Sequence, residues 1–275
     1  MITDFDQRWR DRRAIYKLAG IRGESFQPRL YEVQEDLPEA EARAFTEKNH
    51  YSGSFPVAQR CFGLRYRAEL VGTFVSSVPQ GDKVLRKVFP DKEGMPTDCG
   101  RFVLEEGVPH GGESWFHARV REVLARDGYT GLLAFADDVR RTDAEGRVIY
   151  IGQLGTIYKA SNALFLGRGT PRSVRLMPDG HVFPERSIQK IRKGERGWRG
   201  AAAKLEALGA PRVPEDPEQR LIWLHAALAA HTRPLRHPGP LKYVWRLHKR
   251  ATVVGTPRPY PRIRYADMQP LLFAA

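Results

Sequence analysis

The sequence has little cysteine and no long apolar run. Its 275 residues include only Cys61 and Cys99, which lack the spacing of metal-ligand pairs. This excludes a disulfide framework and a cysteine zinc site, and it is typical of a reducing cytoplasm. No stretch approaches the roughly 20 apolar residues of a membrane span. The first residues, MITDFDQRWRDRRAIYK, are charged and contain no apolar signal segment, so we expect a cytoplasmic protein.

Acidic residues are scarce in the second half of the chain. Residues 1–137 have 20 basic and 21 acidic side chains, whereas residues 138–275 have 25 basic and 11 acidic ones. The net charge of +13 therefore comes entirely from the second half. Charge segregated in this way indicates a polyanionic partner, with nucleic acid ahead of an anionic membrane. A surface that serves only solubility would intersperse both signs.

The apolar content predicts a folded α/β protein. Hydrophobic residues make up 41% and aromatic residues 10% of the chain, which is enough for a core. Periodicity indicates strands at 30–35, 59–66, 69–77, 101–105 and 130–136, helices at 38–49, 115–126 and 155–166, and hairpins at 137–150 and 172–183. This order of elements is similar to that of the GNAT acyltransferase superfamily. We expect a mixed central sheet flanked by helices.

Basic segments follow the last hairpin. We expect an N-terminal arm (1–25), a GNAT-like core (26–183) and a basic, mainly helical C-terminal extension (184–275). KIRKGERGWR and LKYVWRLHKR contain cations with helical spacing, and the second interleaves them with aromatics, which suits phosphate gripping and base stacking. The DNA-binding candidates are Lys190, Arg192, Lys193, Arg196, Lys242, Tyr243 and Arg246. The alternative is a solvated basic face.

A glycine-rich loop, GVPHGGES, runs from Gly107 to Ser114, between a strand and a helix. Backbone N–H groups at a helix N-terminus can hold a pyrophosphate, so Gly111, Gly112 and Ser114 are cofactor-binding candidates. In GNAT enzymes coenzyme A lies at this place, but the loop lacks their leading Arg or Gln. The alternative is an ordinary turn in which Ser114 caps the helix.

Four further residues are candidates for chemistry. Tyr158 lies on the helix where many GNAT enzymes place a tyrosine acid, and Asp137 ends a strand. His50 and Tyr51 begin a loop rich in hydroxyl groups. Each has a structural alternative. Tyr158 would be a half-buried core residue, and Asp137 would be a carboxylate that caps a turn. The loop at His50 and Tyr51 would only form hydrogen bonds with its own backbone.

Taken together, these segments resemble the Mom-type DNA modification proteins of bacteriophages, which are GNAT-like. The resemblance covers roughly residues 26–261 and depends on NHYSGSFP, DCGRFVLEEGVPHGGESWF, FAD, GTIYKASNALFLGRGTPRS, LMPDGHVFPERSIQKIRKGERG and HPGPLKYVWRLHKR…PYP. It implies transfer of a carbamoylmethyl, glycinamide-type group to the exocyclic amine of adenine, which protects phage DNA from host restriction. It also implies a host cytoplasmic location if the chain is encoded by a phage.

By position, the resemblance implies a pocket made of His50, Tyr51, Arg101, Ser114, Asp137 and Tyr158. Asp137 would hold or deprotonate the amine, Tyr158 would act as acid or orienting phenol, and Arg101 would steady the donor. The donor would be an acyl-CoA-type or other activated glycine-derived molecule. Two segments depart from the family: its Glu-Leu-x-Arg reads Asp98-Cys99-Gly100-Arg101, and its Gly-His-x-Gly reads Gly152-Gln153-Leu154-Gly155. Some members are reported to need a metal, but the sequence has no ligand spacing and predicts none.

Adenine paired in a duplex hides its amine, so the base should be flipped out, with the 137–150 hairpin as a candidate wedge. We expect double-stranded DNA as the partner and no membrane. Two other functions stay open. A GNAT N-acetyltransferase of a protein or small-molecule amine would need an intact pyrophosphate loop. A non-catalytic DNA-binding protein on a GNAT scaffold would leave Asp137 and Tyr158 without a shared cavity.

Overall fold

A computed structural model describes residues 26–77, 82–109, 111–150 and 152–261. The expected N-terminal arm, 1–25, lies outside these described residues. The chain divides into two compact units: the first comprises 1–137, 153–168 and 241–275, and the second comprises 138–152 and 169–240. No helix in the described part of the chain is long and apolar enough to cross a membrane.

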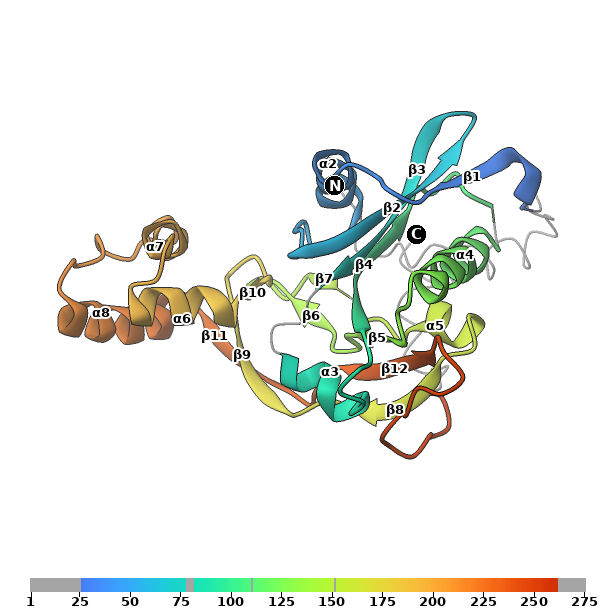
Figure 1. Cartoon of the computed structure of the whole chain (residues 1–275). Helices are drawn as coiled ribbons and strands as arrows, with labels where there is room; N and C mark the ends of the chain where they lie inside the picture. Colours follow the sequence, from blue (N-terminus) through green and yellow to red (C-terminus); the bar gives the residue numbers. More distant parts are fainter. Residues whose placement is uncertain (1–25, 78–81, 110, 151, 262–275) are drawn as a thin grey trace. The chain divides into compact units, whose positions relative to one another are not determined.

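The first unit is built on a seven-stranded sheet (Figure 1). In spatial order its strands are β1 (Tyr31–Gln34), β2 (Ala58–Tyr66), β3 (Glu69–Ser77), β4 (Pro96–Leu104), β5 (Gly131–Ala136), β12 (Leu241–Arg246) and β8 (Leu164–Arg168). The predicted mixed sheet flanked by helices is confirmed. The β2–β3 turn falls at Arg67 and Ala68, as predicted, and both adopt positive φ angles.

The strands β4 and β5 form the sheet's parallel pair, and they part half-way along β4. Their pairing includes Pro96–Gly131, Thr97–Leu132 and Asp98–Leu133 and stops there. Because β4 continues to Leu104, its later backbone groups have no ladder partner on the β5 side. On its other edge β4 pairs with β3 from Asp98 to Leu104, with an irregularity at Gly100. The parting of β4 and β5 thus opens the middle of the sheet.

Helices cover both faces of this sheet. Alternation along β2 points Cys61 to one face, where it packs with Ala42 of α2 (Glu39–Asn49), and Phe62 to the other face. That other face packs against α4 (Gly112–Arg126), on which Phe116, Val120 and Leu124 recur every fourth residue and are all fully buried. The short helices α3 (Asp82–Val88) and α5 (Thr156–Ala160) complete the covering, and a 3₁₀ turn, Pro28–Leu30, precedes β1.

The second unit has a core of its own. It contains the strands β6 (Arg141–Thr142), β7 (Val148–Tyr150), β9 (Arg172–Leu176), β10 (Val182–Phe183) and β11 (Arg233–His237), and the helices α6 (Glu185–Lys193), α7 (Trp198–Glu206) and α8 (Pro217–His231). Ile191, Leu205 and Leu224, one from each helix, are fully buried together. Asp216 caps α8 by accepting from the backbone N–H groups of Glu218 and Gln219.

Two of the helix predictions are wrong. The helix expected over 155–166 ends at Ala160, because Asn162 turns the chain with a φ of 59°, and β8 follows. The helix expected in LKYVWRLHKR is the strand β12, which inserts between β5 and β8. The segment after residue 184 is therefore not one helical extension: three helices are followed by two strands, β11, which pairs with β9, and β12, which returns to the central sheet.

Candidate active site

Polar side chains gather where β4 and β5 part. The β4 segment Asp98–Arg101 lies beside Ser77 of β3 and the loop that follows α2. Gly100 permits this approach, since a Cβ atom there would lie 2.7 Å from Ser77 Cβ and 3.0 Å from Pro56 Cγ. Only glycine fits at this position, so the sequence DCGR brings β4 against the loop.

Arg101 fixes the loop at residues 50–57. Its Nε donates to the Ser54 carbonyl oxygen at 3.0 Å, and one terminal nitrogen donates to Ser54 Oγ at 2.9 Å. The other terminal nitrogen donates to the Gly100 carbonyl oxygen at 2.6 Å. A planar guanidinium used in this way holds its partners in a fixed geometry. The loop is therefore tied to the β4 segment.

His50 is the first residue of this loop. Its Nδ1 accepts from the Ser52 backbone N–H at 3.2 Å and lies 2.8 Å from Ser52 Oγ. With Nδ1 as acceptor, the neutral ring bears its proton on Nε2. Burial, and then the neighbouring Arg101 charge, lower the pKa of His50 to about 3. The ring is thus neutral at physiological pH, and it lies against Tyr51 with centroids 4.3 Å apart.

Tyr158 approaches the same segment from α5. Its hydroxyl is hydrogen-bonded to the Cys99 thiol, and Tyr51 is among its close neighbours. Burial is the main cause that raises the pKa of Tyr158 well above its usual value, so the phenol is protonated. The ring packs against Tyr243 and Trp245, with centroids 5.2 and 5.6 Å away. Gly155, with a φ of 65°, caps the start of α5 and so positions Tyr158.

Asp98 is the acidic member of this group. Its Oδ2 accepts from Ser77 Oγ at 3.4 Å, whereas its buried Oδ1 has no hydrogen-bond partner within the described part of the chain. Burial raises the pKa of Asp98 to about 7, although Ser77 and Arg101 act in the opposite direction. The carboxyl group can therefore exchange a proton near neutral pH. We call His50, Tyr51, Asp98, Cys99, Arg101 and Tyr158 the β4 cluster.

Comparison with known proteins identifies the family. The sequence matches the Mom protein family over residues 31–213. The chain belongs to the Mom protein family. No curated protein sequence matches it. Similar solved structures include a Pyrococcus horikoshii protein described as an acetyltransferase, at 12% identity and a TM-score of 0.38 over 86% of this chain and 97% of that one. Another is a tandem GNAT protein from the clavulanic acid biosynthesis pathway, at 12% identity and a TM-score of 0.41 over 79% and 99%.

Four of the pocket residues implied by the Mom resemblance lie together in the β4 cluster: His50, Tyr51, Arg101 and Tyr158. Asp98 and Cys99 belong to the same cluster, but the sequence did not single them out as site residues. One signal was present: an acid two residues before a glycine, inside the strand PTDCGRFVL. Such an acid is buried at a cost unless it has a use, and it is a candidate for function on that ground.

The other implied residues lie on neighbouring elements. Asp137 directly follows β5, as predicted, and its carbonyl oxygen accepts from the Gln153 N–H. Ser114 is not the helix cap that was expected: α4 begins at Gly112 with Gly111 as the cap, and the Ser114 hydroxyl donates to the Gly111 carbonyl oxygen at 3.0 Å. Their roles stay predictions.

The predicted DNA-binding residues divide into two groups. Arg192, Lys193 and Arg196 are exposed on and after α6, and Lys190 is half-buried there. Tyr243 is wrong as a base-stacking residue, because it is fully buried in the central sheet and its hydroxyl donates to the Leu154 carbonyl oxygen. On the same strand Lys242 is half-buried and Arg246 is exposed.

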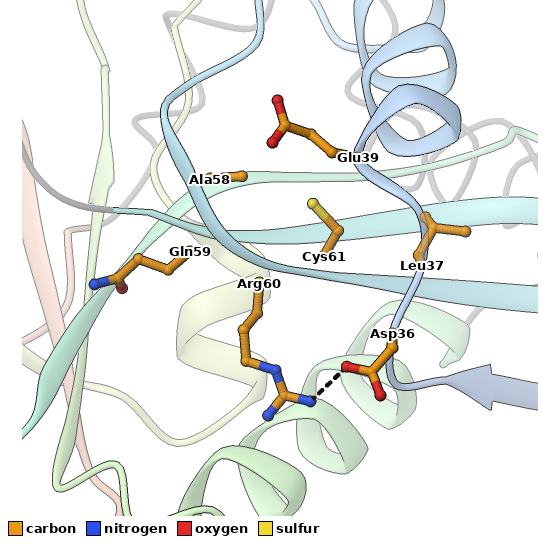
Figure 2. Close-up of a pocket in the computed structure, with 7 residues that line it drawn as sticks. All are labelled: Asp36, Leu37, Glu39, Ala58, Gln59, Arg60 and Cys61. Atoms are coloured by element: carbon orange, nitrogen blue, oxygen red, sulfur yellow. Dashed lines mark hydrogen bonds and ion pairs between the residues drawn. The ribbon is translucent and has the colours of Figure 1, made fainter.

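A pocket of about 220 Å³ lies elsewhere in the first unit, between the start of α2 and β2 (Figure 2). Its lining includes Cys61, Glu39 and the ion pair of Arg60 with Asp36, 3.2 Å apart. None of the predicted site residues lines it. Among the described residues there is no group of three or more His, Cys, Asp or Glu side chains that could hold a metal ion.

Proposed function

We propose that this Mom family protein is a transferase that adds a carbamoylmethyl group to the exocyclic amine of adenine in DNA. The observation that supports it best is the β4 cluster. His50, Tyr51, Arg101 and Tyr158 come from three separate segments, and all four are positions at which the Mom resemblance implies pocket residues. Their hydrogen bonds and ring contacts join them where β4 and β5 part.

The chemistry requires placement and proton removal. An adenine amine is a poor nucleophile, because its lone pair is delocalised into the ring. The enzyme must hold the amine near van der Waals contact with the donor carbon while a proton leaves. In the proposed site Asp137 holds the amine and Arg101 steadies a carbonyl or carboxylate of the donor. Tyr158 is protonated and can donate a hydrogen bond to the leaving group.

The loop before α4 fits an acyl-CoA-type donor. Gly111 caps α4 with a φ of 103°, and around Gly107 a Cβ atom would meet nothing within 4 Å, so this backbone is open to a phosphate. Gly112 serves packing instead, since a Cβ atom there would lie 3.2 Å from the Phe26 ring. We propose that the backbone at Gly107 and Gly111 holds the donor's pyrophosphate, which would bring an activated carbon to the site.

The second unit is the proposed DNA-binding part of the chain. Lys190, Arg192 and Arg196 make no recorded ion pair with another described residue, so their charges are available to phosphates. The hairpin of β6 and β7, with its turn at Gly146, is the proposed wedge that helps flip the target adenine out of the duplex. The resulting product would protect the DNA from restriction enzymes that read adenine.

Co-expression tests this function. Plasmid DNA from cells that express the protein is digested to nucleosides and analysed by mass spectrometry, with an empty vector as the control. The proposal expects deoxyadenosine that is heavier by a carbamoylmethyl group. An acetyl-sized addition on a cellular protein, with unmodified DNA, would favour an amine acetyltransferase. Unmodified DNA that still binds the protein would favour a non-catalytic DNA-binding protein.

A further inference from the structure

We propose that Asp98 is the general base that takes the proton from the adenine amine. This inference rests on the proposed function and adds a catalytic residue to it. It begins from a polar atom: Oδ1 of Asp98 is buried and has no hydrogen-bond partner within the described residues. A buried acceptor without a donor is costly, about 1–3 kcal/mol. A substrate N–H group would satisfy it.

The position of Asp98 supports this use. Asp98 is the last residue of β4 that pairs with β5, so its side chain stands where the sheet opens. The next residue, Cys99, is hydrogen-bonded to Tyr158, and Arg101 follows directly after the irregularity at Gly100. Asp98, the proposed proton acceptor, and Arg101, the cation that steadies the donor molecule, therefore lie within four consecutive residues of β4. Tyr158, which donates a hydrogen bond to the leaving group, lies on the facing helix α5.

The groups around the carboxyl set its charge. Ser77 of β3 donates to Oδ2, and Arg101 is the nearby cation. Cys99 and Tyr158 are the titratable neighbours, and the raised pKa of each keeps it protonated and uncharged. His50 is neutral as well, since its pKa is lowered to about 3. Asp98, with a pKa of about 7, thus changes charge near neutral pH, whereas Cys99, Tyr158 and His50 stay uncharged.

The amine nitrogen attacks the methylene carbon of the glycine-derived donor and a nitrogen–carbon bond forms, since the carbamoylmethyl product is an N-alkyl group and attack on an acyl carbon would give an amide. The bond from that carbon to its leaving group breaks, and the electron pair departs with the leaving group. The proton lost by the nitrogen moves to the Asp98 carboxylate. The phenol of Tyr158 donates a hydrogen bond to the leaving group.

Two substitutions at this position and one control test the assignment. Asp98→Asn keeps the shape and cannot accept the proton, while Asp98→Glu restores a carboxylate. Asp36→Asn is the matched control, because the Asp36 side chain is 90% exposed and lies outside the β4 cluster. For each variant, modified deoxyadenosine is measured in co-expressed plasmid, and thermal melting of the purified protein is measured at about pH 5 and about pH 8.

We expect Asp98→Asn to lower the yield by about 10²-fold or more, Asp98→Glu to give at least about tenfold more product than Asp98→Asn, and Asp36→Asn to stay within about twofold of wild type. The melting data separate this role from a structural one. Asp98 loses its proton less readily in the folded chain than in the unfolded chain, so raising the pH destabilises the wild type relative to Asp98→Asn.

Three outcomes would overturn the assignment. A near-normal yield from Asp98→Asn, while the wild type modifies adenine, removes Asp98 from the chemistry and leaves the proposed function standing. A lost yield together with a lower melting temperature at both pH values makes Asp98 a structural residue. Unmodified plasmid from the wild type itself overturns the proposed function and this inference together.

Discussion

The phenol of Tyr158, on α5, is hydrogen-bonded to the thiol of Cys99, on β4. The contact joins a helix on one face of the sheet to the strand segment that opens its middle. Both groups stay protonated, because burial is the largest cause that raises the pKa of each. The pair therefore offers a donor, not a charge, to whatever lies between β4 and β5.

Removing the Tyr158 hydroxyl should lower the yield of modified adenine without lowering the stability of the fold. Tyr158→Phe keeps the ring contacts with Tyr243 and Trp245, so we expect a melting temperature close to that of the wild type. The loss of an acid or orienting group should lower the modified-adenine yield by about 10²-fold. Tyr66→Phe, far along β2, is the control. A near-normal yield from Tyr158→Phe would show that the hydroxyl has only a packing role.

Asp137 and its neighbour Asp138 provide a second comparison. Asp137→Asn is nearly isosteric, so folding and DNA affinity should persist while modification falls by about 10²-fold or more. Asp138→Asn should be tolerated. Melting temperature, DNA binding and adenine modification are measured for both variants. Equal, near-normal yields would exclude the proposed role of Asp137, and a collapsed melting temperature would make it a turn-capping residue.

Binding to non-specific duplex DNA should depend strongly on salt. Each neutralised phosphate contributes a slope of about −0.9 in log K against log salt. Replacing Lys190, Arg192 and Arg196 together by Ala should weaken binding to all sequences and flatten the slope by about 2–3. A fluorescence anisotropy titration at several salt concentrations measures both. A slope near zero for the wild type would exclude nucleic acid as the partner.

The buried His117 side chain should make the free energy of unfolding depend on pH. Its fully buried ring has no hydrogen-bond partner within the described residues, and burial lowers its pKa to about 3. The unfolded chain, with an ordinary pKa near 6.5, binds the proton more readily. The free energy of unfolding should therefore fall as the pH drops from about 6.5 toward 3, by up to about 1.4 kcal/mol per pH unit for this group.

A substitution isolates that effect. His117 contacts the rings of Phe74, Phe102 and Trp245, so His117→Phe places an apolar ring in an aromatic environment. Urea unfolding of both proteins between about pH 4 and 7 gives the slopes. We expect a shallower acid slope for His117→Phe. Parallel slopes would mean that His117 is already partnered or protonated in the folded state.

Local patterns predicted much of the fold, and long-range pairing explains the errors. The apolar run of β5 and the turn at Arg67 are recognisable because burial and turn chemistry act within a few residues. The strand β12 is not, because LKYVWR becomes a strand only by pairing with β5, more than a hundred residues earlier. Its basic residues suggested a surface helix, whereas Tyr243 and Trp245 face one core and Val244 faces another.

The site was predictable in part for a similar reason. His50, Tyr51, Arg101 and Tyr158 were found through the resemblance to the Mom family, since they match its motifs by position. Asp98 looked like a departure from that pattern. Its burial, its unpartnered oxygen and its place at the parting of β4 and β5 depend on the three-dimensional arrangement. No spacing in the sequence encodes those features.

The central claim is a glycine-derived group on the amine of adenine, and isotope-resolved mass spectrometry tests it most directly. Cells that express the wild-type chain are fed glycine labelled with ¹³C, and plasmid nucleosides are fragmented to separate base from sugar. The account predicts an adenine base that is heavier by a carbamoylmethyl group, contains the label, and is reduced about 10²-fold with Tyr158→Phe. Adenine of ordinary mass in the wild-type sample, or extra mass on the sugar, would contradict it.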